Sequence, residues 1–414
     1  MRAIAPWLAL ALAFAAAPMI FSSGSALTTL SLMGVMIVFA LSYNMLLGQT
    51  GLLSFGHAVY YGLGGFVAIH TMNAIMNAKL GVPAIVIPLV GGLAGLGFGF
   101  LFGLVSTKRA GIVFSMISLG LGELVSSSSF ILRSFFGGEE GVTTNRAKLA
   151  HFLGFRFVSQ IEVYYLIAFW CFVCVLAMYA LTRTPFGRMC NAVRDNPERV
   201  EFIGYSPRML RLIAFSFSAF FAGAAGGLAA IDFEIMNAQQ LGAQQSSLVL
   251  LMAYVGGIGA FAGPIIGAIV ITFLQISLSD VTSAWQLYFG LLFIGVVTWA
   301  PGGIAGLLAL HRQALRQGEA WRLAPAYAMA APALAACVVG AIMLIELGNR
   351  ELALVRSEGS AMRLFGFSVD SASLAPWLVA IVLLGLGLAL MRRLWPAVES
   401  AWGTVNARLR EKAA

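Results

Sequence analysis

Residues 183 to 211 read RTPFGRMCNAVRDNPERVEFIGYSPRMLR, a strongly charged stretch in a chain of which only 10% of residues are charged. Apolar residues dominate on both sides of it. A polar segment between long apolar segments must lie in water, because unpaired charges in hydrocarbon are costly. The charged stretch, residues 183–211, is therefore predicted to be a loop outside a membrane.

The charged stretch contains a clear helix start. Asn196 places a capping side chain before Pro197, and Glu198 follows at the positive end of the helix. Gly204 favours the left-handed conformation that ends a helix. We expect a short helix from Pro197 to Ile203. It is either part of a solvated basic loop, as the positive-inside rule favours, or an element that docks a partner.

Composition indicates a membrane protein. The 414 residues are 60% hydrophobic with a mean hydropathy of +0.90. Several apolar runs are long enough to cross a hydrocarbon core of ~30 Å. The net charge of +8 comes from basic residues in the short loops between these runs, so it predicts topology and not nucleic-acid binding. The expected fold is all-α and polytopic, with about ten to twelve transmembrane helices.

Glycines are placed in two informative patterns. Gly91, Gly95, Gly99 and Gly103 recur every four residues, which predicts a smooth packing face on one helix. A second glycine-rich segment, residues 41–68, reads LSYNMLLGQTGLLSFGHAVYYGLGGFVA. Here the glycines permit either close backbone packing or a break in a helix, and such a break at membrane depth occurs only against protein or a water-lined cavity.

Few polar residues fall within the apolar runs. Ser54, His57 and Tyr61 are expected on one helical face. His57 either lines a translocation path or is a buried histidine satisfied by a neighbouring carbonyl group. Glu123 is a carboxylate inside a predicted span and either takes part in transport or makes a structural hydrogen bond. With Asn44, these residues are the candidates for the translocation path.

The sequence lacks the motifs of an enzyme. No glycine is followed by lysine, so the chain has no P-loop for ATP. No HExxH, GxSxG or paired Cys/His spacing occurs, and neither a catalytic site nor a metal site is expected. A secondary carrier usually places several ionisable residues within the membrane. Because Glu123 and His57 are nearly the only ionisable residues there, the sequence favours a pore whose energy comes from a separate protein.

Five stretches together resemble one known family. They are LSYNMLLGQTGLLSFGHAVYYGLGGF (41–66), GGEEGVT (137–143), RDNPERVEFIGYSPRMLRLIAFSFSAFFAGAAGGLAA (194–230), YVGGIGAFAGPIIGA (254–268) and WQLYFGLLFIGVVTWAPGGIAGLL (285–308). The chain thereby resembles the branched-chain amino acid (LivM-like) permeases of ABC importers. With the apolar runs outside these stretches, three parts are expected: an N-terminal transmembrane helix (1–25), a permease core (26–310) and a C-terminal extension with two further transmembrane helices (311–414). The extension makes the chain longer than the usual core of this family.

The resemblance also implies a site and partners. In this family the loop that matches the charged stretch couples the permease to an ATPase, which carries over to Arg194, Asp195, Asn196, Pro197, Glu198, Arg199 and Gly204. The implied partners are a second permease subunit, two cytoplasmic ATPase subunits, a periplasmic substrate-binding protein and membrane lipid. No cofactor is expected on this chain, because ATP is used by the partner subunits. Phe202 stands where many relatives have alanine.

The expected function is therefore that of a permease subunit and not of an enzyme. It would import branched-chain, hydrophobic amino acids by alternating access, driven by ATP, in the bacterial inner membrane, with many spans and both termini in the cytoplasm. Two alternatives remain open. One is a permease for a related small substrate such as urea, amides or other amino acids. The other is a stand-alone secondary carrier or channel.

Overall fold

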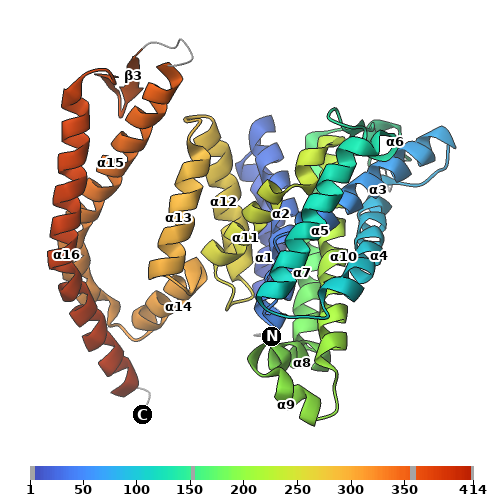
Figure 1. Ribbon diagram of the computed structural model, residues 1–414, viewed down its shortest axis with the longest axis horizontal. Coiled ribbons are helices and arrows are strands. Elements are labelled where there is room, and N and C mark those ends of the chain that lie inside the picture. Colours follow the sequence, from blue (N-terminus) through green and yellow to red (C-terminus); the bar gives the residue numbers. More distant parts are fainter. Residues whose placement is uncertain (1–4, 151–153, 355–359, 412–414) are drawn as a thin grey trace. The chain divides into compact units, whose positions relative to one another are not determined.

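The chain is built almost entirely from helices. The computed structural model describes residues 5–150, 154–354 and 360–411 (Figure 1). By its internal contacts the chain divides into two compact units. Unit 1 is Met1–Ile276 with Phe293–Gly306, and unit 2 is Ser277–Leu292 with Leu307–Ala414. The predicted all-α polytopic fold is confirmed.

Twelve of the described α-helices begin within residues 1–276, the longer segment of unit 1. They are α1 (Ala5–Ile20), α2 (Gly24–Thr50), α3 (Ala58–Asn77), α4 (Ile87–Ser106), α5 (Ile112–Ile131), α6 (Arg133–Phe136), α7 (Gln160–Arg183), α8 (Pro185–Asp195), α9 (Pro197–Phe202), α10 (Pro207–Phe233), α11 (Ala243–Gly256) and α12 (Gly263–Ser279). Strands β1 (Val142–Thr143) and β2 (Ile235–Met236) pair antiparallel, with Val142 opposite Met236.

Helices α2 and α10 form the centre of unit 1. In the most apolar window of each, 83% of the residues are buried, compared with 33% for α4 and α5. Both central helices are apolar on all sides, as expected of a helix surrounded by other helices. Around them, α3, α4 and α7 pack against one or both (Figure 1).

The predicted glycine face is confirmed and packs against α10. A side chain added at Gly95 would lie 2.2 Å from the carbonyl oxygen of Ala219, and one at Gly91 would lie 2.6 Å from that of Gly223. Gly99 faces the methyl group of Ala219. Without side chains on this face, the two backbones approach closely, which is how helices associate inside a membrane.

Unit 2 has a simple construction. It contains α15 (Ala324–Leu354) and α16 (Leu374–Glu411), which lie side by side and are joined through the hairpin of β3 (Ala361–Leu364) and β4 (Phe367–Asp370) (Figure 1). Only 17% and 11% of the most apolar windows of α15 and α16 are buried. Their hydrophobic outer surfaces are suited to lipid or to a protein partner.

Three of the described helices, α12, α13 (Trp285–Trp299) and α14 (Gly303–Arg316), contain residues of both units. Helix α13 is followed after a bend of 48° by α14. Helix α14 also runs through residues 310 and 311, where the end of the permease core was expected, and that domain division stays a prediction.

Among the described residues, seven helices are long and apolar enough to span a membrane, or eight if the bent pair α13–α14 is one span. Helix α12 and the apolar part of α1 are shorter than a full span. Helix α1 accounts for most of the first apolar run, of which residues 3 and 4 lie outside the described ranges. The expected count of about ten to twelve spans therefore stays a prediction.

Candidate functional site

The charged stretch folds into two short helices at one end of unit 1 (Figure 1). Helix α9 begins where predicted, because the side chain of Asn196 accepts a hydrogen bond of 3.0 Å from the Arg199 amide. It ends at Phe202, one residue earlier than expected, and Gly204 follows with a φ of 89°. The predicted short helix is thus present, capped at its start and followed by a left-handed glycine.

Helix α8 was missed by the sequence analysis. Thr184 caps it by accepting a hydrogen bond of 3.3 Å from the Gly187 amide, and Pro185 is its first residue. This is the same cap-and-proline signal that predicted α9, so Thr184-Pro185 could have revealed the helix.

The two short helices have one buried side and one exposed side. Val193, Val200 and Leu210 form a small buried cluster that holds α8 and α9 to the start of α10. On the outside, Phe202 is 90% exposed, and Ile203 is also exposed. Exposed hydrophobic side chains among charges are characteristic of a protein-binding surface.

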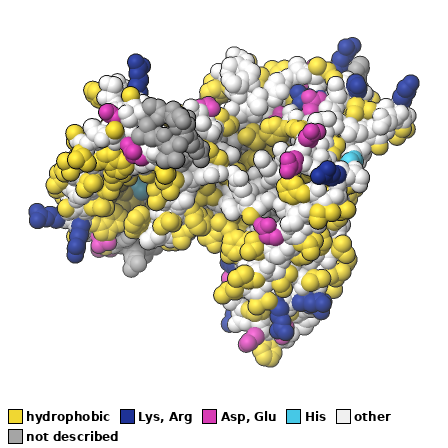
Figure 2. Space-filling model, turned by 45° about the horizontal axis from the view of Figure 1, so that its top comes forward, with side chains coloured by type: hydrophobic (Ala, Val, Ile, Leu, Met, Phe, Trp, Pro, Cys, Tyr) yellow, Lys and Arg dark blue, Asp and Glu magenta, His cyan; other side chains and the backbone are white. Residues whose placement is uncertain are grey.

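Figure 2 shows Lys, Arg, Asp and Glu side chains in small separate groups among large areas of hydrophobic side chains. All seven predicted coupling residues are exposed: Arg194, Asp195, Asn196, Pro197, Glu198, Arg199 and Gly204. Arg194 differs from the others. Its guanidinium group donates to the carbonyl oxygen of Gly48 in α2, and to the carboxylate of Asp195 at 3.1 Å.

Of the two alternatives for the glycine-rich segment, a break in the helix is present. Helix α2 ends at Thr50, and Gly51 adopts a left-handed conformation with a φ of 70°. Its amide donates to the carbonyl of Leu47, which closes the last turn. The chain then runs without helix until α3 begins at Ala58. We refer to residues 51–57 as the break.

The predicted helical face of Ser54, His57 and Tyr61 is wrong. Ser54 lies within the break, His57 precedes the first residue of α3, and only Tyr61 lies inside a helix. A helix continuing through Gly51 would have aligned them, but the left-handed glycine ends α2 first. All three side chains are nevertheless buried, as is that of Asn44.

His57 is enclosed by aromatic rings. Its Nε2 lies 3.0 Å from the hydroxyl oxygen of Ser42. The ring centroids of Phe39, Tyr43 and Tyr60 lie 5.7, 5.2 and 5.9 Å from the centroid of the His57 ring. The side chain has no exposed surface. A translocation path lined by His57 would therefore require these rings to move.

Helix α5 has two different faces. On one, Ser115 donates to the carbonyl of Leu53 at 2.7 Å, and Ser118 accepts from the Phe55 amide at 3.1 Å, so this face holds the break. On the other, the Glu123 side chain is exposed in the middle of the helix. A mid-span carboxylate is suited to a protein partner or a water-filled path and not to lipid.

The described residues contain no group of three or more His, Cys, Asp or Glu side chains that could hold a metal ion. Cys171, Cys174 and Cys190 are free and buried, and Cys337 is free and partly buried.

Comparison with known proteins identifies relatives. A family model described as "Branched-chain amino acid transport system / permease component" matches residues 25–300. The chain is 26% identical to the high-affinity branched-chain amino acid transport system permease protein LivM of Escherichia coli, over 68% of this chain and 69% of that protein. It is 22% identical to the corresponding BraD protein of Pseudomonas aeruginosa, over 64% of this chain and 90% of that one.

A more distant relative differs in its substrate. The chain is 24% identical to the fructose import permease protein FrcC of Rhizobium meliloti, over 44% of this chain and 54% of that protein. No solved structure matches the chain. Related permeases thus include one named for a sugar, so likeness alone does not fix a substrate.

Proposed function

Because this chain belongs to the branched-chain amino acid permease family of ABC transporters, we propose that it imports branched-chain amino acids by ATP-driven alternating access. The observation that carries the proposal is the exposed surface of α8 and α9. It joins hydrophobic and charged side chains at one end of the helical unit, where an ATPase subunit would bind.

The position of α9 supports a coupling role. Helix α9 is separated from α10 only by residues 203–206, and α10 is one of the two central helices. Because Val200 and Leu210 pack together, a push on α9 moves the start of α10 with it. Helix α10 contacts α2, α3 and α4, so its movement would alter the centre of the unit.

The proposed complex contains this chain, a second permease subunit, two ATPase subunits and a periplasmic binding protein. The ATPases hydrolyse ATP, and this chain is not an enzyme. The exposed Glu123 fits a place against the second permease subunit or on the path between the two subunits, where its charge is not in contact with lipid. The positive-inside rule places α8, α9 and both termini in the cytoplasm of a bacterium.

The test uses two substitutions in the coupling surface. Glu198→Arg reverses an exposed charge on α9, and Gly204→Val puts a β-branched residue at a φ of 89°. The complex is reconstituted in proteoliposomes, and uptake of radiolabelled leucine is measured with ATP on the ATPase side. Both substitutions are expected to lower uptake about tenfold or more, while the chain inserts and purifies normally.

Matched controls separate coupling from folding. Gly204→Asn keeps a residue that tolerates the left-handed conformation, and it is expected to retain most of the uptake. Arg188→Met removes an exposed charge from α8 outside the coupling set. Uptake at the wild-type level in both Glu198→Arg and Gly204→Val would contradict the proposed coupling role.

The substrate and the energy source need separate measurements. Competition of leucine uptake by urea, amides, other amino acids and fructose distinguishes the alternative substrates. A stand-alone carrier would move leucine without ATP and without the ATPase subunits. Uptake that persists with ADP, or in vesicles that hold this chain alone, would overturn the ATP-driven mechanism.

A further inference from the structure

Among the predicted coupling residues, Arg194 is turned toward the helical bundle. It lies in the last turn of α8, and its guanidinium group donates to the carbonyl oxygen of Gly48. The carbonyl groups in the last turn of a helix lack helical partners and carry partial negative charge. An arginine at this point therefore binds the end of α2 both by a hydrogen bond and by its charge.

The stem of Arg194 fits against a glycine. A side chain added at Gly51 would lie 2.9 Å from Cγ of Arg194, closer than such atoms approach. Gly51 is also the left-handed residue that ends α2. The guanidinium group of Arg194 thus binds Gly48 in the last turn of α2, and its aliphatic carbons lie against Gly51, which ends the helix.

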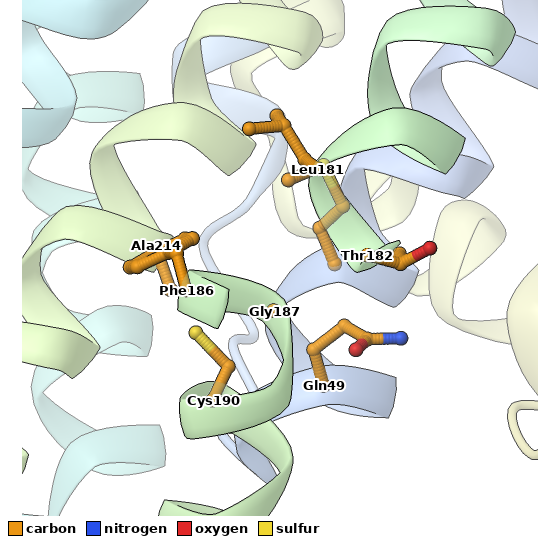
Figure 3. Close-up of a pocket in the computed structure, with 8 residues that line it drawn as sticks. Gln49, Leu181, Thr182, Phe186, Gly187, Cys190 and Ala214 are labelled. Atoms are coloured by element: carbon orange, nitrogen blue, oxygen red, sulfur yellow. The ribbon is translucent and has the colours of Figure 1, made fainter. Parts of the chain in front are cut away.

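A small, mainly apolar cavity lies beside α2 and α8. Gln49 of α2 and Cys190 of α8 line this cavity of about 10 Å³ together with residues of α7 and α10 (Figure 3). Apolar burial is non-directional, so by itself it does not fix the position of one helix along another. The bond from Arg194 to Gly48 is directional and does so.

The break that follows Gly51 has few helical hydrogen bonds and depends on its neighbours. Its residues are bonded to Ser115 and Ser118 of α5, and the Ala58 amide just after it donates to Ser246 of α11 at 3.1 Å. Tyr43 of α2 donates to the carbonyl of Ser54 at 3.1 Å. A shift of the end of α2 would therefore reach α3, α5 and α11 through the break.

We propose that Arg194 is a positioning residue that ties the end of α2 to α8 and relays movement of α8 and α9 to the break. Its use in transport rests on the proposed function, whereas the contact with α2 can be tested in the chain alone. The alternative is that Arg194 binds the ATPase, because its side chain is 41% exposed and paired with the exposed Asp195.

The first experiment measures hydrogen exchange of the purified chain in lipid nanodiscs. Arg194→Met keeps much of the stem and removes the hydrogen bond and the charge. Amide exchange in peptides that cover residues 51–58 is expected to rise about tenfold, the loss of one hydrogen bond to a charged group. Arg188→Met removes the same charge from an exposed site on the same helix and is expected to leave exchange unchanged.

The second experiment measures leucine uptake and ATP hydrolysis in the same proteoliposomes. Arg194→Met is expected to lower the ratio of uptake to hydrolysis about tenfold, while the ATPase still copurifies with the permease. Arg194→Lys keeps a charge that reaches a carbonyl group but lacks the planar fork of arginine. It is expected to restore part of the ratio.

Each outcome has a consequence. Wild-type exchange in Arg194→Met, or a wild-type ratio, overturns the proposed relay. Loss of the ATPase from Arg194→Met also overturns it and makes Arg194 a docking residue. If the wild-type complex shows no ATP-driven uptake, the proposed function is overturned instead. The exchange measurements then still decide whether Arg194 holds the break in place.

Discussion

At the level of single residues, Arg146 holds the end of unit 1 opposite to α8 and α9. Its side chain is 9% exposed. It donates to the carbonyl oxygens of Ile231 and Asp232 at 2.8 Å and to that of Phe157 at 3.1 Å. Ile231 and Asp232 belong to the last turn of α10. One guanidinium group therefore ties the segment around Arg146 to the end of this helix.

Arg146→Met is expected to destabilise the protein by about 3 kcal/mol, because it leaves several buried carbonyl groups without a donor. A lower temperature of thermal unfolding in detergent would show it. Arg156→Met is the matched control, since Arg156 is an exposed arginine of the same loop. Equal unfolding temperatures for the two variants would contradict the role given to Arg146.

Cys190 is expected to react slowly with thiol reagents. Burial raises the pKa of its thiol to about 12, so little thiolate is present at neutral pH. In a chain with the other three cysteines replaced by alanine, its maleimide labelling should be about a hundredfold slower than that of a cysteine placed at the exposed position 202. Similar rates, or a labelling rate that levels off near pH 8.5, would contradict this expectation.

Neither Arg146 nor the inward turn of Arg194 could be predicted from the sequence. The hydrogen-bond partners of Arg146 in α10 lie 85 and 86 residues away, and the partner of Arg194 lies 146 residues away. Local patterns such as caps and charges contain no information on such distant pairs. The sequence therefore indicated that Arg194 is functional but not which side it faces.

At the level of elements, the packing of α4 on α10 makes a sharp prediction. Gly95→Val is expected to destabilise the protein by about 2 kcal/mol or more, because an added side chain would collide with the Ala219 backbone. Gly97→Val is the control on the same helix, since a side chain there meets nothing within 4 Å. Thermal unfolding of the two variants in detergent tests the prediction, and a similar loss in both would contradict it.

The same elements show what sequence patterns can and cannot predict. The four-residue spacing from Gly91 to Gly103 was sufficient to predict a packing face, because small residues on one helical face have few other uses in a membrane. The break was one of two alternatives that the sequence left open, and its geometry could not be predicted. Whether a helix passes through a glycine depends on bonds to other helices, here those from Ser115 and Ser118.

At the level of the whole molecule, composition and length were sufficient for the all-α polytopic fold, whereas the number of spans was not. Short apolar helices such as α12 have the composition of a span without its length. The division into units was equally hidden, because residues 277–292 belong to unit 2 whereas residues 293–306, which follow them directly, belong to unit 1.

Removal of residues 317–414 is expected to affect unit 2 alone. Glu346 of α15 accepts hydrogen bonds of 3.1 Å from Thr282 and 2.7 Å from Tyr288, and the truncated chain loses both. Limited proteolysis in detergent should then cut within residues 277–292, while α2 to α11 stay protected as in the full chain. New cuts within α2 or α10 would show that unit 1 depends on the missing helices.

Helix α10 has 27 residues and is thus ~40 Å long. One end adjoins α9, and the other is gripped by Arg146. Beside it lies the glycine face of α4, which has no side chains that interlock with those of α10. Helix α10 could therefore tilt about the end that Arg146 holds without separating interlocked side chains on this face. A tilt of ~5° about one end would displace the other by ~3 Å, about the reach of one hydrogen bond.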